Sequence, residues 1–191
     1  MAITNTPTEQ IVRIVSAQRA FFRSGQTLDI EYRLSALRAL KAALKKGEKP
    51  LGEGLWKDLH KSYEEAYLTE LSIVLGEIDN HISHLKGWAS PKRCSTPLKM
   101  FPSRSKTISE PLGCSLIIAP WNYPVQLLLN PLVGAISAGC TAILKPSPYV
   151  ESVSKVIEEL IRETFNENYI AVVQGNRDVN TALLEQRYDL I

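Results

Sequence analysis

The sequence predicts an α/β fold in which amino-terminal helices precede a doubly wound parallel sheet, that is, a sheet with helices on both faces. In residues 1–89, apolar side chains recur at intervals of three and four, as in helices that bury one face. In residues 112–191, short apolar runs alternate with helical segments, which is typical of parallel strands joined by helices. The composition agrees, because 45% hydrophobic and 22% charged residues are ordinary values for a globular protein.

Four helices are expected in residues 1–89. The first begins near Thr6, whose hydroxyl we expect to cap it, and ends at Gly25. The second runs from about residue 29 to residue 46, and a short third surrounds Leu55 and Leu59. The fourth is the longest and has a continuous apolar stripe made by Leu68, Leu71, Leu75, Ile78, Ile82 and Leu85.

Residues 90–111 differ in composition from both of their neighbours. They are rich in Pro, Lys, Ser and Thr and poor in apolar residues. Such a segment is a loop or an exposed two-stranded arm, and it separates the helical residues 1–89 from the alternating residues 112–191. Exposed strands can pair with those of a second copy, so this segment is a candidate oligomerisation arm.

The alternating part of the chain contains four predicted strands and three predicted helices. The strands lie at residues 115–118, 141–144, 169–173 and 188–191, and the helices at residues 125–138, 152–165 and 179–186. The fourth strand begins only four residues before the end of the sequence. Because parallel strands are buried on both faces, we expect the chain to be the truncated amino-terminal part of a larger domain.

A stretch without charged side chains covers residues 111–144, which is long enough to cross a bilayer. Prolines, asparagines and glycines interrupt it, so we expect a buried strand, turn, helix and strand and no membrane span. The first ten residues are polar and contain no apolar signal sequence, which favours a cytoplasmic protein. The net charge of +2 is spread along the chain, which indicates no nucleic-acid partner.

The three cysteines, Cys94, Cys114 and Cys140, form no CxxC pair and have no histidine at metal-ligand spacing. Small buried hydrophobic residues in a reducing compartment explain them better than a zinc site or a disulfide. We therefore expect no metal site.

Three turns are candidates for a ligand site, because ligands bind an open parallel sheet at the carboxyl ends of its strands. They span residues 119–124, 145–148 and 174–176. Simpler interpretations exist: Asn122 as a cap of the next helix, and Lys145 as a solvated strand end. Trp121 could belong to the core, and the prolines could only stiffen loops. Neither phosphate-binding pattern, GxGxxG or GxxxxGK[ST], occurs in the sequence.

Five short motifs carry a resemblance to a known family. They are PLG at residues 111–113, IAPWNYP at 118–124, NPLVGA at 130–135, AGC at 138–140 and KPS at 145–147. Together they resemble the aldehyde dehydrogenase superfamily. The compact amino terminus and the segment Leu75-Gly76-Glu77-Ile78-Asp79 are similar to its class 3 branch.

The resemblance implies a Rossmann-like cofactor domain and NAD(P)-dependent oxidation of an aldehyde to a carboxylic acid. Asn122 matches the side-chain amide that donates to the oxyanion formed when a cysteine thiolate attacks the aldehyde. Lys145 matches the residue that bonds the adenosine ribose hydroxyls, and Ser147 and Pro148 follow it in the same turn. The other positions that match the dinucleotide site contact it mainly through backbone and apolar atoms: Ile118, Ala119, Pro120, Trp121 and Gly175.

Pro148 departs from the family pattern. The family commonly has an acidic residue after this Lys-Pro-Ser motif, which reaches the ribose, whereas the proline side chain cannot accept that hydrogen bond. A carboxylate at this position would also repel the 2′-phosphate of NADP. Its absence leaves either NAD or NADP as the expected cofactor.

The resemblance places the glycine-containing turn for the pyrophosphate, the nucleophilic cysteine and the general-base glutamate beyond residue 191. This chain alone is therefore expected to oxidise no aldehyde, and the full-length enzyme is expected to be a homodimer. The competing interpretation is a non-catalytic α/β module in which the helical stripe from Leu68 to Leu85 binds a partner.

Overall fold

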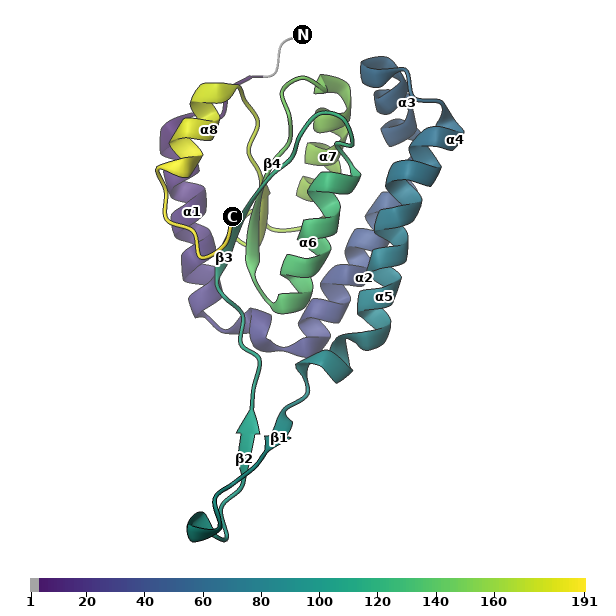
Figure 1. Cartoon of the computed structure of the whole chain (residues 1–191). Coiled ribbons are helices and arrows are strands. Elements are labelled where there is room, and N and C mark those ends of the chain that lie inside the picture. Colours follow the sequence, from purple (N-terminus) through teal and green to yellow (C-terminus); the bar gives the residue numbers. More distant parts are fainter. Residues whose placement is uncertain (1–3) are drawn as a thin grey trace.

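The computed structural model describes residues 4–191, and the first three residues of the polar amino-terminal segment lie outside the described residues. A three-stranded parallel sheet lies between helical layers, and a two-stranded arm extends from this body (Figure 1). The helices are α1 (Thr8–Arg23), α2 (Ile30–Lys46), α3 (Glu48–Leu59), α4 (Tyr63–Ala66), α5 (Ser72–Ala89), α6 (Gln126–Ala138), α7 (Glu151–Thr164) and α8 (Arg177–Leu184). The strands are β1 (Lys92–Cys94), β2 (Ser105–Thr107), β3 (Cys114–Ile118), β4 (Thr141–Lys145) and β5 (Ile170–Val172).

The strand order in the main sheet is β3–β4–β5, and both pairings are parallel, as the alternation of strands and helices predicts. In the register of the first pair, Ile118 lies opposite Lys145. The predicted strand at residues 188–191 is present only as a bridge in which Leu190 pairs with Ser115 in the parallel sense. Leu190 therefore lies beside β3 on the side away from β4.

Two hydrophobic cores cover the two faces of this sheet, because successive strand residues point to opposite faces. On one face, Leu116, Ile143 and Ala171 pack with α1 and α8. On the other face, Ile117 and Leu144 pack with α6 and α7, and α2, α3 and α5 extend this core outward (Figure 1). Helices on both faces confirm the predicted doubly wound arrangement.

The helix positions follow the prediction closely, but the cap of the first helix does not. α2 begins after Asp29, whose side chain accepts a hydrogen bond from the Glu31 amide at 3.0 Å. The prediction that Thr6 caps α1 is wrong, because the N-cap residue is Pro7. The Thr6 hydroxyl instead accepts a hydrogen bond from the Gln174 amide at 3.1 Å. It therefore ties the amino-terminal segment to the turn that follows β5.

The predicted apolar stripe of the long helix is continuous only in part. Leu71, Ile78 and Leu85 are buried, whereas Leu68 is 65% exposed. Leu68 lies within a π-helical turn at Tyr67–Leu71, whose wider i→i+5 hydrogen bonding interrupts the helical period of the stripe. The buried part of the stripe packs in the core that α5 shares with α2 and α6. The alternative in which this stripe binds a partner is therefore wrong for its buried residues.

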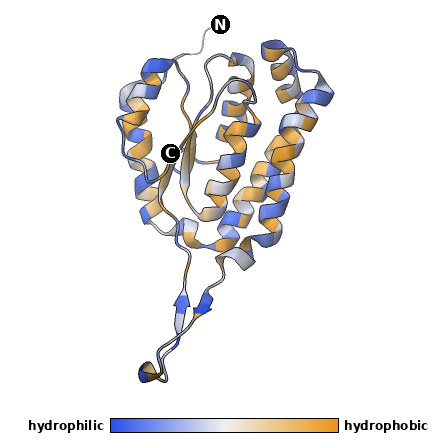
Figure 2. Ribbon diagram, viewed as in Figure 1, coloured by the Kyte–Doolittle hydropathy of each residue, from blue (hydrophilic) through white to orange (hydrophobic). Residues whose placement is uncertain are grey.

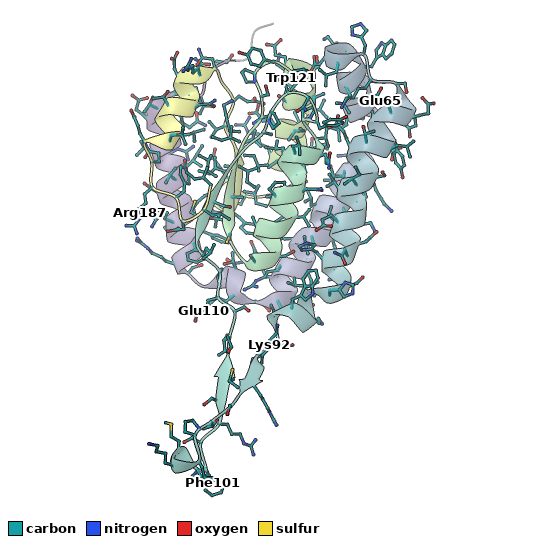
Figure 3. All side chains as sticks on the ribbon, viewed as in Figure 1. Glu65, Lys92, Phe101, Glu110, Trp121 and Arg187 are labelled. Carbon is teal, nitrogen blue, oxygen red and sulfur yellow. The ribbon has the colours of Figure 1, made fainter. Side chains whose placement is uncertain are left out.

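Of the two alternatives expected for residues 90–111, a loop or a two-stranded arm, the structure has the arm, in which β1 and β2 pair antiparallel. The arm leaves the body near Lys92, reaches its tip near Phe101, and lies at the end of the molecule opposite Trp121 (Figure 3). Its strands are mainly hydrophilic (Figure 2), but Leu98 and Phe101 at the tip are 89% and 82% exposed. The role of the arm in oligomerisation stays a prediction.

The uncharged stretch forms β3, a turn, α6 and β4 up to Leu144, as predicted. Gly139 ends α6 in the left-handed region, with φ of 85°. Within the described part of the chain, no helix is both long enough and apolar enough to cross a membrane.

Candidate functional site

The turns predicted to bind a ligand begin at neighbouring strand ends along one edge of the sheet. β3 and β4 end together, because Ile118 pairs with Lys145 and the Ala119 amide donates a hydrogen bond to the Lys145 carbonyl at 3.1 Å. β5 ends beside β4, where the Val173 amide donates to the Leu144 carbonyl at 2.9 Å. The parallel sheet thus brings the three predicted turns together.

The strand order reverses at β3. After β3 the chain passes through α6, on one face of the sheet, and forms β4 on one side of β3. After α8, on the other face, it reaches the opposite side of β3, where Leu190 pairs with Ser115. In an open parallel sheet, a crevice for ligands opens at the carboxyl end of the strand where the order reverses. An apolar cavity of about 510 Å³ lies on this side of β3; it runs along β3 and α6, and none of residues 119–124 or 145–148 lines it. The turn that contains Asn122 starts at the end of the same strand.

The structure excludes helix capping as the role of Asn122. α6 begins at Gln126 with Val125 as its N-cap residue, so Asn122 lies outside the helix and its cap. The Asn122 side chain is exposed. The exposed side-chain amide, four residues beyond the end of β3, has two N–H donors to offer a bound group.

The other predicted residues of this turn differ in exposure. Trp121 is 54% exposed, so its interpretation as a core residue is wrong. Ile118 is 39% exposed, Ala119 is buried and Pro120 is exposed. The turn therefore presents apolar side chains and backbone at the strand end.

A buried carboxylate that sequence reasoning missed caps α6 in place of Asn122. Glu70 has no exposed surface, and it accepts hydrogen bonds from the Val125 amide at 2.7 Å and the Gln126 amide at 3.3 Å. It also forms an ion pair with Lys61, at 2.7 Å between Nζ and Oε1. The only sequence signal is a charged residue next to Leu71 of the apolar stripe, which by itself predicts an exposed helix position.

Lys145 is buried, so its interpretation as a solvated strand end is wrong. The residue is 1% exposed, and Nζ donates a hydrogen bond to the Pro146 carbonyl at 2.8 Å. Burial lowers the pKa of this ammonium from 10.5 to about 8. A buried cation next to a strand end is costly unless further acceptors or negative charge approach it. Its surroundings therefore favour an electron-rich ligand.

The turn after Lys145 is held against α7. The Ser154 hydroxyl donates to the Ser147 carbonyl at 3.0 Å, and the Ser147 hydroxyl accepts from the Tyr149 amide at 3.3 Å. Ser147 is buried and Pro148 is half-buried. Because Pro148 has no polar side-chain atom, it offers neither a hydrogen-bond acceptor nor a negative charge beside Lys145.

Gly175 occupies a backbone conformation that favours glycine, with φ of 146° in the turn between β5 and α8. A Cβ atom added there would lie 2.3 Å from Val179 Cγ2 and 2.9 Å from Asn5 Oδ1. Close packing of this turn thus explains the glycine without a ligand. Its contact with a dinucleotide stays a prediction.

The cysteines lie away from this site or are buried. Cys114 and Cys140 are buried, and burial raises the pKa of the Cys114 thiol, which disfavours a reactive thiolate. Cys94 is exposed but belongs to β1 of the arm, at the end of the molecule opposite Trp121 (Figure 3). Among residues 4–191, no group of three His, Cys, Asp or Glu residues is arranged to hold a metal ion.

Comparison with known proteins identifies the family. Residues 1–189 match the model of the aldehyde dehydrogenase family. The chain belongs to the aldehyde dehydrogenase family. It is 44% identical over 173 residues to the 4,4'-diaponeurosporen-aldehyde dehydrogenase of Staphylococcus aureus, which covers 91% of this chain and 38% of that enzyme. It is 38% identical over 179 residues to aldehyde dehydrogenase family 3 member A2 of Rattus norvegicus, covering 94% and 37% of the two chains. These matches confirm the class 3 resemblance.

Further matches to aldehyde dehydrogenases agree. The chain is 35% identical over 182 residues to a Canis lupus familiaris enzyme named "Aldehyde dehydrogenase, dimeric NADP-preferring", covering 95% of this chain and 40% of that enzyme. The solved structure of the substrate-bound state of Staphylococcus aureus AldH superposes with a TM-score of 0.89 and 44% identity, covering 92% and 38% of the two chains. The α/β fold expected from the resemblance is thus confirmed, and the chain spans about two-fifths of these aldehyde dehydrogenases.

Proposed function

We propose that this chain supplies the oxyanion donor and part of the dinucleotide site of an enzyme that oxidises an aldehyde to a carboxylic acid with NAD or NADP. The observation that carries the proposal is the adjacency of the exposed Asn122 turn and the buried Lys145 at the strand where the sheet order reverses. Family membership supports the reaction class.

Asn122 is proposed to stabilise the oxyanion. A thiolate that attacks an aldehyde carbonyl converts its oxygen into an alkoxide, and a positioned amide N–H lowers the energy of that charge. Removal of one such donor typically raises the barrier by about 3–4 kcal/mol. The family position of Asn122 and its exposed amide both fit this role. The dinucleotide, when bound, accepts the hydride that the substrate carbon loses.

Lys145 fits the adenosine end of the dinucleotide. Its ammonium has three N–H donors. One of them donates to the Pro146 carbonyl. Ribose hydroxyls can accept from the remaining donors, and the 2′-phosphate of NADP can supply opposite charge. Since Pro148 replaces the usual carboxylate, we propose that the enzyme accepts NADP as well as NAD.

The nucleophile and the general base are proposed to come from a part of the protein beyond the matched region. The Staphylococcus aureus relative is longer, because the match covers 38% of it. Within residues 4–191, neither of the two buried cysteines nor Cys94 of the arm is an accessible thiol beside Asn122. This chain alone is accordingly proposed to be inactive.

The arm is proposed to join two copies into a homodimer. Its tip exposes large apolar side chains, Leu98, Met100 and Phe101, on a projection that has few contacts with the body. The dog relative is named dimeric, which supports the same assembly.

The deciding experiment compares Asn122→Ala with wild type in the full-length enzyme. We expect kcat to fall by a factor of about 10²–10³, with the dissociation constant of the cofactor nearly unchanged. Asn80→Ala, an exposed asparagine on α5, is the matched control and should leave both constants unchanged. An Asn122→Ala enzyme with wild-type kcat would rule out the oxyanion role.

A further inference from the structure

The loop that carries Asn122 is attached to the helical layer by one buried ion pair. Lys61 lies between α3 and α4, and Glu70 lies in the π-helical turn before α5. Glu70 is 0% exposed and Lys61 is 8% exposed, and their charged atoms are 2.7 Å apart. Both residues lie outside the sheet that forms the proposed cofactor site.

This ion pair contacts the backbone in the middle of the loop and at the end that leads into α6. Lys61 Nζ donates a hydrogen bond to the carbonyl of Asn122 itself at 2.9 Å, and it lies 3.9 Å from the centre of the Tyr123 ring. On the other side of the pair, Glu70 Oε2 accepts from the amides of Val125 and Gln126. The peptide carbonyl of Asn122 and the start of α6 are therefore fixed to the same two side chains.

Stability alone is a weak explanation for such a pair. Burying an ammonium and a carboxylate has a large desolvation cost, and an apolar pair of similar volume is often as stable. An apolar pair, however, could neither donate to the Asn122 carbonyl nor accept from the Val125 amide. The ion pair adds directional contacts to a loop in which Trp121, Asn122 and Tyr123 are exposed. π-Helical turns such as the one that carries Glu70 occur frequently at functional sites.

We propose that the Lys61–Glu70 ion pair positions the Asn122 side chain for oxyanion binding. The inference rests on the proposed function of Asn122, and both residues are positioning residues that touch neither substrate nor cofactor. The carboxylate of Glu70 holds the helix start, and the ammonium of Lys61 holds the Asn122 peptide. With its peptide held, Asn122 directs its side-chain amide toward the substrate before the substrate arrives. The hydrogen bond from this amide to the oxyanion then needs no reorganisation.

The first experiment uses this 191-residue chain and needs no activity. Glu70→Gln keeps the shape of the side chain but removes its charge and places N–H groups where an acceptor is needed. We expect hydrogen exchange of the Val125 and Gln126 amides to accelerate about 10- to 100-fold, the factor for losing a hydrogen bond to a charged group. Amides deep in α6, such as that of Val133, should exchange at the wild-type rate.

Lys61→Met and a surface control complete this experiment. Lys61→Met removes the donor to the Asn122 carbonyl and leaves Glu70 unpaired, so the same two amides should exchange faster. Glu163→Gln breaks an exposed ion pair with Lys46 and should change none of these rates. Unchanged exchange in Glu70→Gln, or equal acceleration along the whole of α6, would overturn the proposal, because the pair would then not act on the loop.

The second experiment measures kinetics in the full-length enzyme. Glu70→Gln should lower kcat about tenfold or more and leave the dissociation constant of the cofactor unchanged. In an Asn122→Ala background the same substitution should lower kcat less than about twofold, because the group that it positions is already absent. Full additivity of the two effects on kcat would overturn the positioning role.

The two experiments separate the two proposals. If Asn122→Ala retains wild-type kcat, the oxyanion role of Asn122 fails, and with it the positioning role, whatever the exchange rates are. If Asn122→Ala is impaired but Glu70→Gln is not, the function of Asn122 stands and only the positioning role is wrong.

Discussion

The buried ammonium of Lys145 makes the stability of the chain depend on pH. Lys145 is 1% exposed, and burial lowers its pKa from 10.5 to about 8. Replacement by methionine keeps an unbranched side chain that is one atom shorter and removes the charge. At neutral pH the wild-type protein carries a buried ammonium that the Lys145→Met variant lacks.

The sign of the effect follows from proton binding. Between about pH 8 and pH 10.5, the unfolded chain keeps its proton on this lysine and the folded chain releases it. The free energy of unfolding of wild type therefore rises with pH in this window. One pKa unit corresponds to about 1.4 kcal/mol, so the full difference between 10.5 and about 8 sets an upper limit of roughly 3 kcal/mol.

The assay is urea denaturation of wild type and Lys145→Met between pH 7 and pH 10. The free energy of unfolding of wild type minus that of the variant should increase as the pH rises above about 8. Lys46→Met is the control, because Lys46 is on the surface with its side chain 76% exposed, and its difference from wild type should stay flat. A difference for Lys145→Met that does not change with pH would refute the reasoning.

Three further predictions concern the turns that follow β4 and β5 and the tip of the arm. Wild type should use NADP and NAD with kcat/KM values within roughly tenfold of each other, or about 1.4 kcal/mol. Pro148→Glu should shift the preference toward NAD by weakening NADP binding. A wild type with strong NAD selectivity that Pro148→Glu leaves unchanged would contradict this. Gly175→Ala should destabilise the chain by about 1–3 kcal/mol in urea denaturation, because its φ is 146° and its Cβ would meet Val179; a stability equal to wild type would show that the turn can relax. Phe101→Ser at the arm tip should weaken self-association in sedimentation velocity, and a wild-type chain that is monomeric at all concentrations would refute the dimer.

Much of the fold was predictable because it depends on local patterns. The periodicity of apolar residues located the helices, and the short apolar runs located β3, β4 and β5 to within a residue or two. The placement of the candidate turns was also predictable, since parallel strands joined by helices must end at the same edge. The roles of Asn122, Lys145 and Pro148 rest on the family resemblance and remain proposals.

The contacts of individual side chains were less predictable. Thr6 is of a residue type that often caps helices, yet its hydroxyl accepts a hydrogen bond from the amide of Gln174, which is distant in sequence. Leu68 continues an apolar stripe, yet it lies in a π-helical turn and is exposed. For Thr6, a local capping preference of about 1 kcal/mol gives way to a tertiary contact that the pattern does not encode. For Leu68, the apolar pattern does not show where the helical period changes.

The sequence by itself determined the order of helices and strands, the parallel sheet and the family resemblance, because each follows from periodicity, turn residues or short motifs. It left residues 90–111 as a loop or an arm, and the structure decided for the arm. Only the tertiary structure decided that Asn122 is not a helix cap, that Lys145 is buried, and that Lys61 and Glu70 reach the Asn122 loop. The physical reason is distance along the chain. Glu70 and Val125 are 55 residues apart in sequence, and their 2.7 Å hydrogen bond exists only after α5 and α6 have packed together.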